Sequence, residues 1–448
     1  MILKPLISFL GANKLPLRAQ SMLQKAVITI VFIELFFGLS STFYVLFVID
    51  SVGYELLGVL LFVSFILQAV LDYPSGTIGD WIGQKWLLFV AYLSFGLAYL
   101  LLFVADSFET LLLVYCIQAF ASSQASGAID TWIDNNYKIA VGKEDPDREV
   151  YRLFWGKYGM ISQFISGMAF LTGGFLSTVV NRQFVFIIQS AGLFILAVAF
   201  LFIIRDFPEV ERVAEKSLKN YLNLLVGGLS AVFMNRVLLL LILGICIRDI
   251  TWVIWSNMIL FPLYFSYTGS DAGASIFRFI LFIAGIPIIG LAAKIASKLD
   301  VKWMPRMLTV HTLLFFGGFI IITELFPLGQ NTFELMALVL CFIVFVSTPI
   351  FFHIPNILQQ KIMLDAIPDK NRNAVYSLIP TMLLLVNAPA TFSGGTIIGG
   401  LGLTLTLIAI GVISLVGTGL AYLAIKSLPK STEDAIEAKR QESAAASV

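Results

Sequence analysis

The chain alternates long apolar runs with short polar turns. A helix that crosses ~30 Å of hydrocarbon needs about 20 apolar residues, and runs of this length recur along most of the sequence. The runs that qualify begin near Ala26, Tyr54, Trp86, Phe108, Leu153, Phe184, Val237, Ala272, Met304, Phe333, Tyr376 and Leu403. The pattern therefore predicts an all-α membrane protein with twelve transmembrane helices.

Positive charge in the predicted loops indicates which side of the bilayer each loop faces. Lysine and arginine collect on the cytoplasmic side of most membrane proteins. When the N-terminus is placed inside, nearly all of the 29 lysines and arginines fall on that side, and Arg182 alone lies on the other. Arg248 and Arg278 lie within spans. We therefore expect a multi-pass protein of the cell membrane with both termini in the cytoplasm.

The runs divide the chain into two similar halves. We expect, in order, a cytoplasmic N-terminal arm over 1–25, a six-helix bundle over 26–204, a cytoplasmic linker with an amphipathic helix over 205–236, a second six-helix bundle over 237–426 and a disordered cytoplasmic tail over 427–448. Two polar loops support this division, because residues 146–151 resemble residues 368–376, about half the chain away. Parallel six-helix halves are a transporter design, with the substrate site between them near the bilayer midplane.

Composition agrees with lipid as the main surrounding of the chain. Hydrophobic residues make up 58% and charged residues 13%, whereas a soluble chain carries roughly a quarter charged residues. The net charge of +1 gives no broad basic surface for nucleic acid. Cys116, Cys246 and Cys341 fall inside apolar runs and fit small buried hydrophobes better than metal ligands. We expect no cofactor and no metal, and partners limited to a small-molecule substrate, protons and the lipid bilayer.

The polar stretch after the second run carries the most specific motif. Residues 72–85 read Asp-Tyr-Pro-Ser-Gly-Thr-Ile-Gly-Asp-Trp-Ile-Gly-Gln-Lys. This stretch resembles the Gly-x-x-x-Asp-Arg-x-Gly-Arg-Lys signature of the major facilitator superfamily (MFS) and its acidic-x-Pro-Thr/Ser-Gly lead. Residues 126–134 are similar to the Ser-Gly-x-x-Glu-Ala-Trp-x-x-Asp stretch of many prokaryotic members, and residues 367–377 give a third match. The resemblance implies the MFS fold of two pseudo-symmetric bundles, a monomer, and a place in an exporter-like branch.

The resemblance also implies a set of gating residues. In the family, the aspartate matched by Asp80 latches the cytoplasmic ends of neighbouring helices in one access state, and the motif glycines let those helices approach closely. The residues that take this role here are Asp72, Gly76, Asp80, Gly83, Lys85, Asp130, Asp134 and Arg372. Trp81 and Gln84 stand where the family has basic residues, so the charged half of the latch differs. A tight turn with a helix cap is the alternative interpretation.

Charged residues inside the spans are the candidates for a transport path. A charge deep in the bilayer costs at least ~2.5–3.5 kcal/mol, so it is expected to face a cavity or a partner. Glu34 in the first span and Arg248 in the seventh lie at depths that the repeat makes equivalent. We predict that Glu34, Arg248 and Asp249 form one polar centre, with Glu34 as the proton carrier. Trp252 and Trp255, one and two turns beyond Arg248, would stack on an organic substrate.

Other interpretations of these residues stay open. Arg248 could form a static ion pair with one of the carboxylates, or it could anchor an anionic substrate. The two tryptophans could be core aromatics. His311 and His353 fit structural histidines, and Arg278 is expected to extend to the outer headgroups.

The sequence predicts a secondary active transporter of a small organic solute that works by alternating access, with proton-coupled efflux by antiport as the expected mode. An organic anion transporter anchored by Arg248 is one alternative, and a membrane receptor or scaffold that binds without moving its ligand is another. A membrane enzyme would have only Asp130, Asp134 and His353 as candidates, and no metal-ligand spacing joins them. We therefore expect no enzymatic activity.

Overall fold

The computed structural model describes residues 3–146, 148–209, 229–230, 232–367 and 372–428. All regular secondary structure within these residues is helical. Twelve of the described helical segments are long and apolar enough to cross a membrane, which confirms the predicted number of spans.

The N-terminal bundle contains the first six spans. They are α2 (Leu17–Gly38), α3 (Tyr44–Ile82), α4 (Gln84–Leu102), α5 (Phe108–Ala125) with α6 (Ala128–Val141), α7 (Glu149–Val179) and α8 (Arg182–Ile203). The fourth span is broken between α5 and α6, where Gly127 has a φ of 65°, a left-handed conformation that glycine adopts without steric cost.

The C-terminal bundle contains the other six spans. They are α10 (Arg236–Ile254) with a π-helical turn (Trp255–Ile259) and α11 (Leu260–Thr268), then α12 (Asp271–Ala296), α13 (Met304–Leu325) after a 3₁₀ turn (Val301–Trp303), α14 (Leu335–Ser347) with α15 (Ile350–Ala366), α16 (Arg372–Leu401) and α17 (Leu403–Lys426). The tenth span is broken at Thr348 and Pro349, as the fourth is at Gly127. The break in both spans agrees with the internal repeat, because the fourth and tenth spans are equivalent in it.

Several helix ends differ from the hydropathy pattern. The first span begins at Leu17 instead of Ala26, because the helix continues beyond the apolar run into a polar stretch. The second helix starts at Tyr44, but Gly53 interrupts it with non-helical backbone angles (φ 78°, ψ 174°), so its long apolar segment begins at Tyr54, as expected. A short helix, α1 (Lys4–Leu10), precedes them and packs against α2 and α7. The expected linker helix and the tail fall mainly on residues 210–228 and 429–448, which lie outside the described residues.

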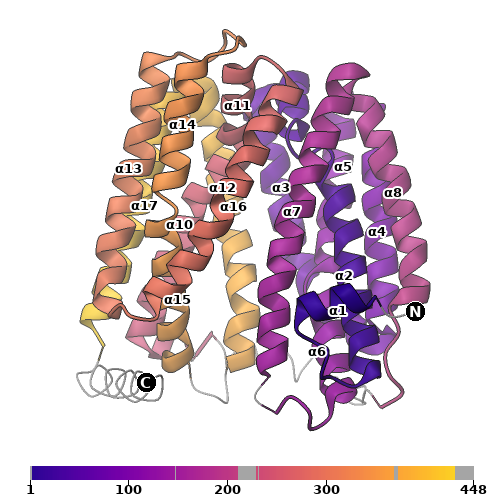
Figure 1. Cartoon of the computed structure of the whole chain (residues 1–448). Coiled ribbons are helices and arrows are strands. Elements are labelled where there is room, and N and C mark those ends of the chain that lie inside the picture. The colour runs from indigo at the N-terminus through magenta and orange to yellow at the C-terminus, as the bar shows by residue number, and fades with distance from the viewer. Residues whose placement is uncertain (1–2, 147, 210–228, 231, 368–371, 429–448) are drawn as a thin grey trace.

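The two bundles stand side by side and meet along two helix pairs, α3 with α16 and α7 with α12 (Figure 1). We call the end of the molecule where α2 begins and α17 finishes the terminal end, and the other end the opposite end. Gly58 and Gly395 bring α3 and α16 close together. A Cβ on Gly58 would lie 2.9 Å from the Thr391 carbonyl oxygen, and one on Gly395 would lie 2.4 Å from that of Tyr54.

The buried apolar side chains form two separate clusters. The larger cluster covers the N-terminal bundle and continues into the opposite-end half of the C-terminal bundle, where it includes Tyr264, Phe277 and Phe319. The smaller one contains only C-terminal-bundle residues, among them Met304 and Ile354, from the terminal-end half. The bundles therefore share one core toward the opposite end and have separate cores toward the terminal end.

Candidate functional site

A cavity of about 220 Å³ opens between α10, α13, α15 and α17 of the C-terminal bundle. Its volume lies just below the ~300–1,000 Å³ of sites for drug-sized ligands, which suits a small solute. Three of the five expected path residues line it, namely Arg248, Asp249 and Trp252. His311, Asn356 and Gln359 contribute further polar groups. The cavity therefore combines a cation, a carboxylate, two amides and an imidazole in one small volume.

The Arg248 side chain is fixed by neighbours on three helices. Its Nη2 donates a hydrogen bond to Gln359 Oε1 on α15, and its Nε donates to the Gly244 carbonyl of its own helix over 3.4 Å. Gly417 on α17 leaves room for the arginine stem, since a Cβ there would lie 2.7 Å from Arg248 Cγ. Because a guanidinium has five N–H donors, the remaining ones can bind a solute in the cavity.

Asp249 follows Arg248 directly but has its own partner. Asn387 Nδ2 on α16 donates to Asp249 Oδ2 over 2.6 Å. Among the described residues, no ion pair within 4 Å joins Arg248 to a carboxylate. The two side chains therefore present opposite charges to the cavity as separate groups.

The two expected tryptophans lie in different environments. Trp252 is 49% exposed and stacks on Phe352 with ring centroids 5.9 Å apart, so an aromatic face borders the cavity. Trp255 is fully buried among aromatic rings that include Phe315 and Phe319, and it begins the π-helical turn. The structure thus brings Trp252 to the cavity and places Trp255 in the core. Sequence reasoning assigned no path role to His311, which also stacks on Phe315 at the cavity wall.

Glu34 lies in the N-terminal bundle and does not join Arg248. Its Oε1 accepts a hydrogen bond from Ser162 Oγ and its Oε2 one from Ser166 Oγ, each over 2.6 Å, so α7 holds both carboxylate oxygens. The described residues include no ion pair between Glu34 and Arg248. The expected single polar centre is therefore divided in this structure. The repeat makes the two residues equivalent in depth, but equivalent positions belong to different bundles and need not touch.

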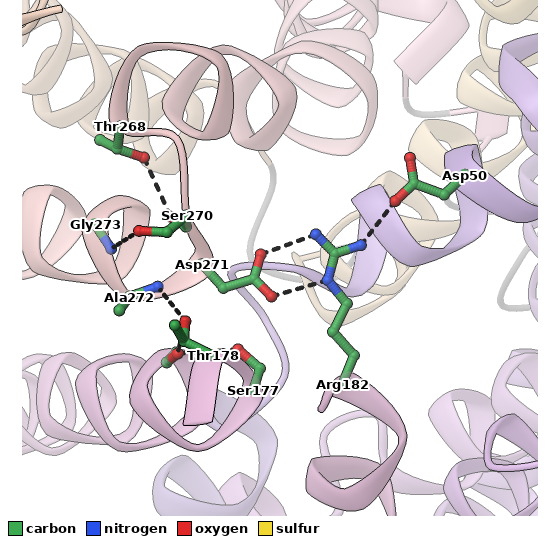
Figure 2. A network of polar contacts seen from close by, with 10 residues as sticks. Asp50, Ser177, Thr178, Arg182, Thr268, Ser270, Asp271, Ala272 and Gly273 are labelled. Atoms are coloured by element: carbon green, nitrogen blue, oxygen red, sulfur yellow. Dashed lines mark hydrogen bonds and ion pairs between the residues drawn. The ribbon is translucent and has the colours of Figure 1, made fainter. Parts of the chain in front are cut away.

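An ion-pair network crosses between the bundles at the opposite end (Figure 2). Arg182, the first residue of α8, donates from Nε and Nη2 to the two carboxylate oxygens of Asp271 over 2.8 and 2.9 Å. Its Nη1 donates to Asp50 Oδ2 over 2.8 Å. The side chains of Arg182 and Asp271 are only 18% and 8% exposed, whereas that of Asp50 is 65% exposed. We call these three residues the opposite-end latch.

A backbone contact continues the latch along the seam between α7 and α12. Thr178 Oγ1 accepts a hydrogen bond from the Ala272 amide over 3.1 Å, as Figure 2 shows. Deeper in the same seam, a Cβ on Gly174 would lie 2.0 Å from Ser275 Oγ. The seam is therefore closed from the latch inward. Sequence reasoning missed this network, although Arg182 was the only basic residue on its side of the predicted membrane.

Arg278 also lies between the bundles instead of extending to the headgroups. Its Cζ is 3.5 Å from the ring centroid of Phe170, 4.7 Å from that of Phe261 and 5.4 Å from that of Phe282. Its Nη1 donates to Ser41 Oγ over 2.9 Å. Ser41 and Phe170 belong to the N-terminal bundle, so Arg278 makes contacts across the interface. Favourable cation–π contacts explain why the side chain turns inward.

Two of the motif stretches meet at the terminal end of the N-terminal bundle. Asp72 on α3 is half-buried and accepts a hydrogen bond from Ser126, at the break between α5 and α6. Gly83 joins α3 to α4 with a φ of 89°, and the Lys85 ammonium lies 5.0 Å from the Trp86 ring. The surroundings of Gly76 and the side chains of Asp80 and Arg372 lie outside the described part of the structure.

The second motif aspartate on α6 is part of a charge network with the loop before α7. Asp134 accepts a hydrogen bond from Arg148 Nη1 over 2.9 Å and also pairs with Lys138, while Asp130, one turn earlier, is exposed. In that loop, Asp145 Oδ2 accepts from the Tyr137 hydroxyl over 2.6 Å. Burial alone raises the pKa of Asp145, but this bond and the backbone N–H donors that follow outweigh it and hold the pKa below its ordinary value.

Within the described residues, no three or more His, Cys, Asp or Glu side chains are placed to hold a metal ion.

Comparison with known proteins agrees with the geometry. The crystal structure of a mutant of the nucleoside transporter NupG is similar with a TM-score of 0.69 and 15% identity, covering 91% of this chain and 100% of that one. A D-xylose–proton symporter gives a TM-score of 0.65 and 13% identity, covering 91% and 98%. Among curated protein sequences, none matches this chain. The sequence profile described as Major Facilitator Superfamily matches residues 26–382, and the chain therefore belongs to this superfamily.

Proposed function

We propose that the protein moves a small organic solute across the bilayer by alternating access, that protons drive the movement, and that the direction is export. One observation carries the alternating-access part of this proposal. The bundles share a continuous buried core and an ion-pair latch at the opposite end, while their cores are separate at the terminal end. A transporter that alternates between two access states has this asymmetry in the state sealed on one side.

The cavity in the C-terminal bundle is the proposed solute site. Arg248 can donate to an acceptor on the solute, Asp249 can accept from a donor, and the exposed face of Trp252 can cover an apolar or planar part. Specific recognition of a small solute needs this combination, because polar groups fix its orientation while apolar faces supply affinity.

Glu34 is the proposed proton site. Its two partners are serine hydroxyls, and a hydroxyl can donate to a carboxylate or accept from a protonated carboxyl group. The Ser162 and Ser166 pair therefore suits both protonation states of Glu34. A lysine or arginine in the same place would favour only the charged state.

A second candidate is transport of an organic anion. Arg248 favours it, since the guanidinium borders the cavity and the described residues place no carboxylate within ion-pair distance of it. A carboxylate or phosphate on the solute would supply the missing partner. The two candidates share one site and differ in the charge of the solute.

Flux into proteoliposomes tests the function. Vesicles that contain a pH-sensitive dye would receive nucleosides, pentoses, dipeptides, carboxylates or a lipophilic cation, with a pH gradient imposed in either direction. The proposal predicts that at least one compound moves in exchange for protons, that a proton gradient drives its export, and that Glu34→Gln abolishes the proton movement. The matched control is Glu324→Gln, since Glu324 bonds Thr404 at the bundle surface.

The same assay separates the alternatives. Solute movement without proton movement would contradict proton coupling, and uptake driven by the gradient would contradict export. Saturable binding of a compound that never crosses the vesicle membrane would point to a receptor and contradict transport.

A further inference from the structure

Each bundle contributes one arginine and one aspartate to the opposite end of the interface. Arg182 and Asp50 belong to the N-terminal bundle, and Asp271 and Arg278 belong to the C-terminal bundle. Their pairing in this closed arrangement is uneven. Arg182 binds both carboxylates, while no carboxylate of the described residues lies within ion-pair distance of Arg278.

The arrangement leaves Arg278 dependent on the neighbouring bundle. The ring of Phe170 and the hydroxyl of Ser41 are its shortest contacts, and both come from the N-terminal bundle. These contacts only partly replace an ionic partner, since a cation–π contact contributes about 0.5–2 kcal/mol. A cation inside a membrane is otherwise expected to pair with an acidic group or a backbone carbonyl.

Separation of the bundles at this end would break two sets of contacts at once. Arg182 and Asp50 would stay together, because α8 and α3 lie in the same bundle. Asp271 would lose Arg182, and Arg278 would lose Phe170 and Ser41. Asp271 would then have no ionic partner, and Arg278 would keep only the rings of Phe261 and Phe282 in its own bundle. These two groups of opposite charge both lie on α12.

The helix geometry lets these two groups meet. Asp271 and Arg278 are seven residues apart, which is two helical turns on the same face and about 10 Å of rise. Side chains of an α-helix lean toward its N-terminus, so the long arginine can extend toward Asp271, the first residue of α12, once its contacts with the other bundle are lost. A direct bond, or a bond through one water, can span the remaining gap.

We propose that Asp271 exchanges Arg182 for Arg278 when the opposite end opens. In the closed state Asp271 joins the two bundles, and in the open state each bundle carries its own ion pair. The inference rests on the alternating access proposed above. It makes Arg278 a positioning residue of the open state, although its contacts with Phe170 and Ser41 belong to the closed state.

Removal of the Arg278 charge distinguishes ion-pair exchange from a purely structural role, because the two predict opposite changes in how often the opposite end opens. If exchange occurs, Arg278→Gln removes the partner of Asp271 from the open state and makes opening rarer. If Arg278 only braces the closed interface, the same change removes its contacts with Phe170 and Ser41 and makes opening more frequent.

The rate of alkylation at a buried cysteine measures the opening. Thr391→Cys is a suitable reporter, because Thr391 is fully buried on α16, where its carbonyl faces Gly58 of α3 in the other seam. Cys116, Cys246 and Cys341 would first be replaced by serine, and a water-soluble maleimide would be applied to the full-length protein. We expect Arg278→Gln to slow the reaction at least threefold and Arg278→Lys, which keeps the charge, to change it less than twofold.

The same change in an Asp271→Asn background supplies the decisive comparison. Exchange predicts that Arg278→Gln then has no slowing effect, because the open-state partner is already gone. Faster alkylation of the single variant, or equal slowing in both backgrounds, would overturn the proposal.

Asp271→Asn alone gives a test that does not depend on folding of the Arg278 variant. This substitution removes a partner from both states, so exchange predicts that the alkylation rate changes less than threefold. An increase of the rate by tenfold or more would overturn the proposal. If Arg182→Gln also failed to increase alkylation, alternating access itself would be contradicted, which separates the two failures.

Discussion

Arg182→Gln should shift the protein from the closed to the open state at the opposite end. The substitution removes the cation that joins Asp50 and Asp271, and it leaves both carboxylates near each other. Since the side chains of Arg182 and Asp271 are mostly buried, their pair belongs to the class whose disruption costs about 3–5 kcal/mol. The pair with the exposed Asp50 belongs to the class worth about 0.2–1 kcal/mol, and it exists in both states.

Part of this free energy is recovered when the opposite end opens, because Asp271 then contacts water or a new partner. We therefore expect a net shift of about 2–3 kcal/mol, which is roughly a 30- to 150-fold change in the ratio of open to closed molecules. Spin labels at Val179 and Phe333 would report this ratio. Both residues are exposed near the opposite end, one in each bundle, at 79% and 67%.

Distance distributions between the labels should gain a long component in Arg182→Gln. Arg182→Lys keeps the charge but loses the two-pronged geometry, so it should show a smaller gain. Asp50→Asn is the matched control, and it should change the ratio less than about fivefold because its pair is exposed. A distribution unchanged by Arg182→Gln would refute the assignment of the latch.

Three further outcomes follow from the described contacts. Arg248→Lys should lower solute uptake or release at least tenfold in proteoliposomes without lowering the melting temperature, since lysine cannot reproduce the guanidinium geometry. Trp252→Ala should raise KM up to about tenfold, by loss of an exposed aromatic face, whereas Trp255→Ala should cost about 3–5 kcal/mol of unfolding free energy in chemical denaturation. Because the pKa of Asp145 is lowered, its stabilising contribution is complete above about pH 4, the ordinary aspartate pKa, and is lost as pH falls further. Below that pH, the melting temperature of Asp145→Asn should therefore fall less steeply than that of the unsubstituted protein.

The sequence predicted the spans and the family well because both depend on averaged or local properties. Hydropathy over about 20 residues is sufficient to count membrane helices, and the motif over residues 72–85 is contiguous. The ends of the helices and the breaks within them were harder to predict from the sequence. Gly127 and Pro349 interrupt spans whose apolar character continues on both sides, so hydropathy does not register the change of direction.

Partners of the charged residues were hardest to predict. The repeat predicts equivalent depths for Glu34 and Arg248, but each side chain bonds a neighbour from its own bundle, Ser166 and Gln359 respectively. These neighbours are uncharged and lie more than one hundred residues away along the chain, so no local pattern marks them. Arg182 did carry a signal, because a single basic residue among acidic outer loops has few possible partners.

A reversible lock at the opposite end tests the central claim most directly. Thr178 and Ala272 lie in contact across the two bundles, with 3.1 Å between Oγ1 and the amide nitrogen, so cysteines at both positions should form a disulfide in the closed state. In a protein otherwise free of cysteine, oxidation should stop solute flux in proteoliposomes, and reduction should restore it. Flux that continues at the same rate with the disulfide intact would contradict transport by alternating separation of the two bundles.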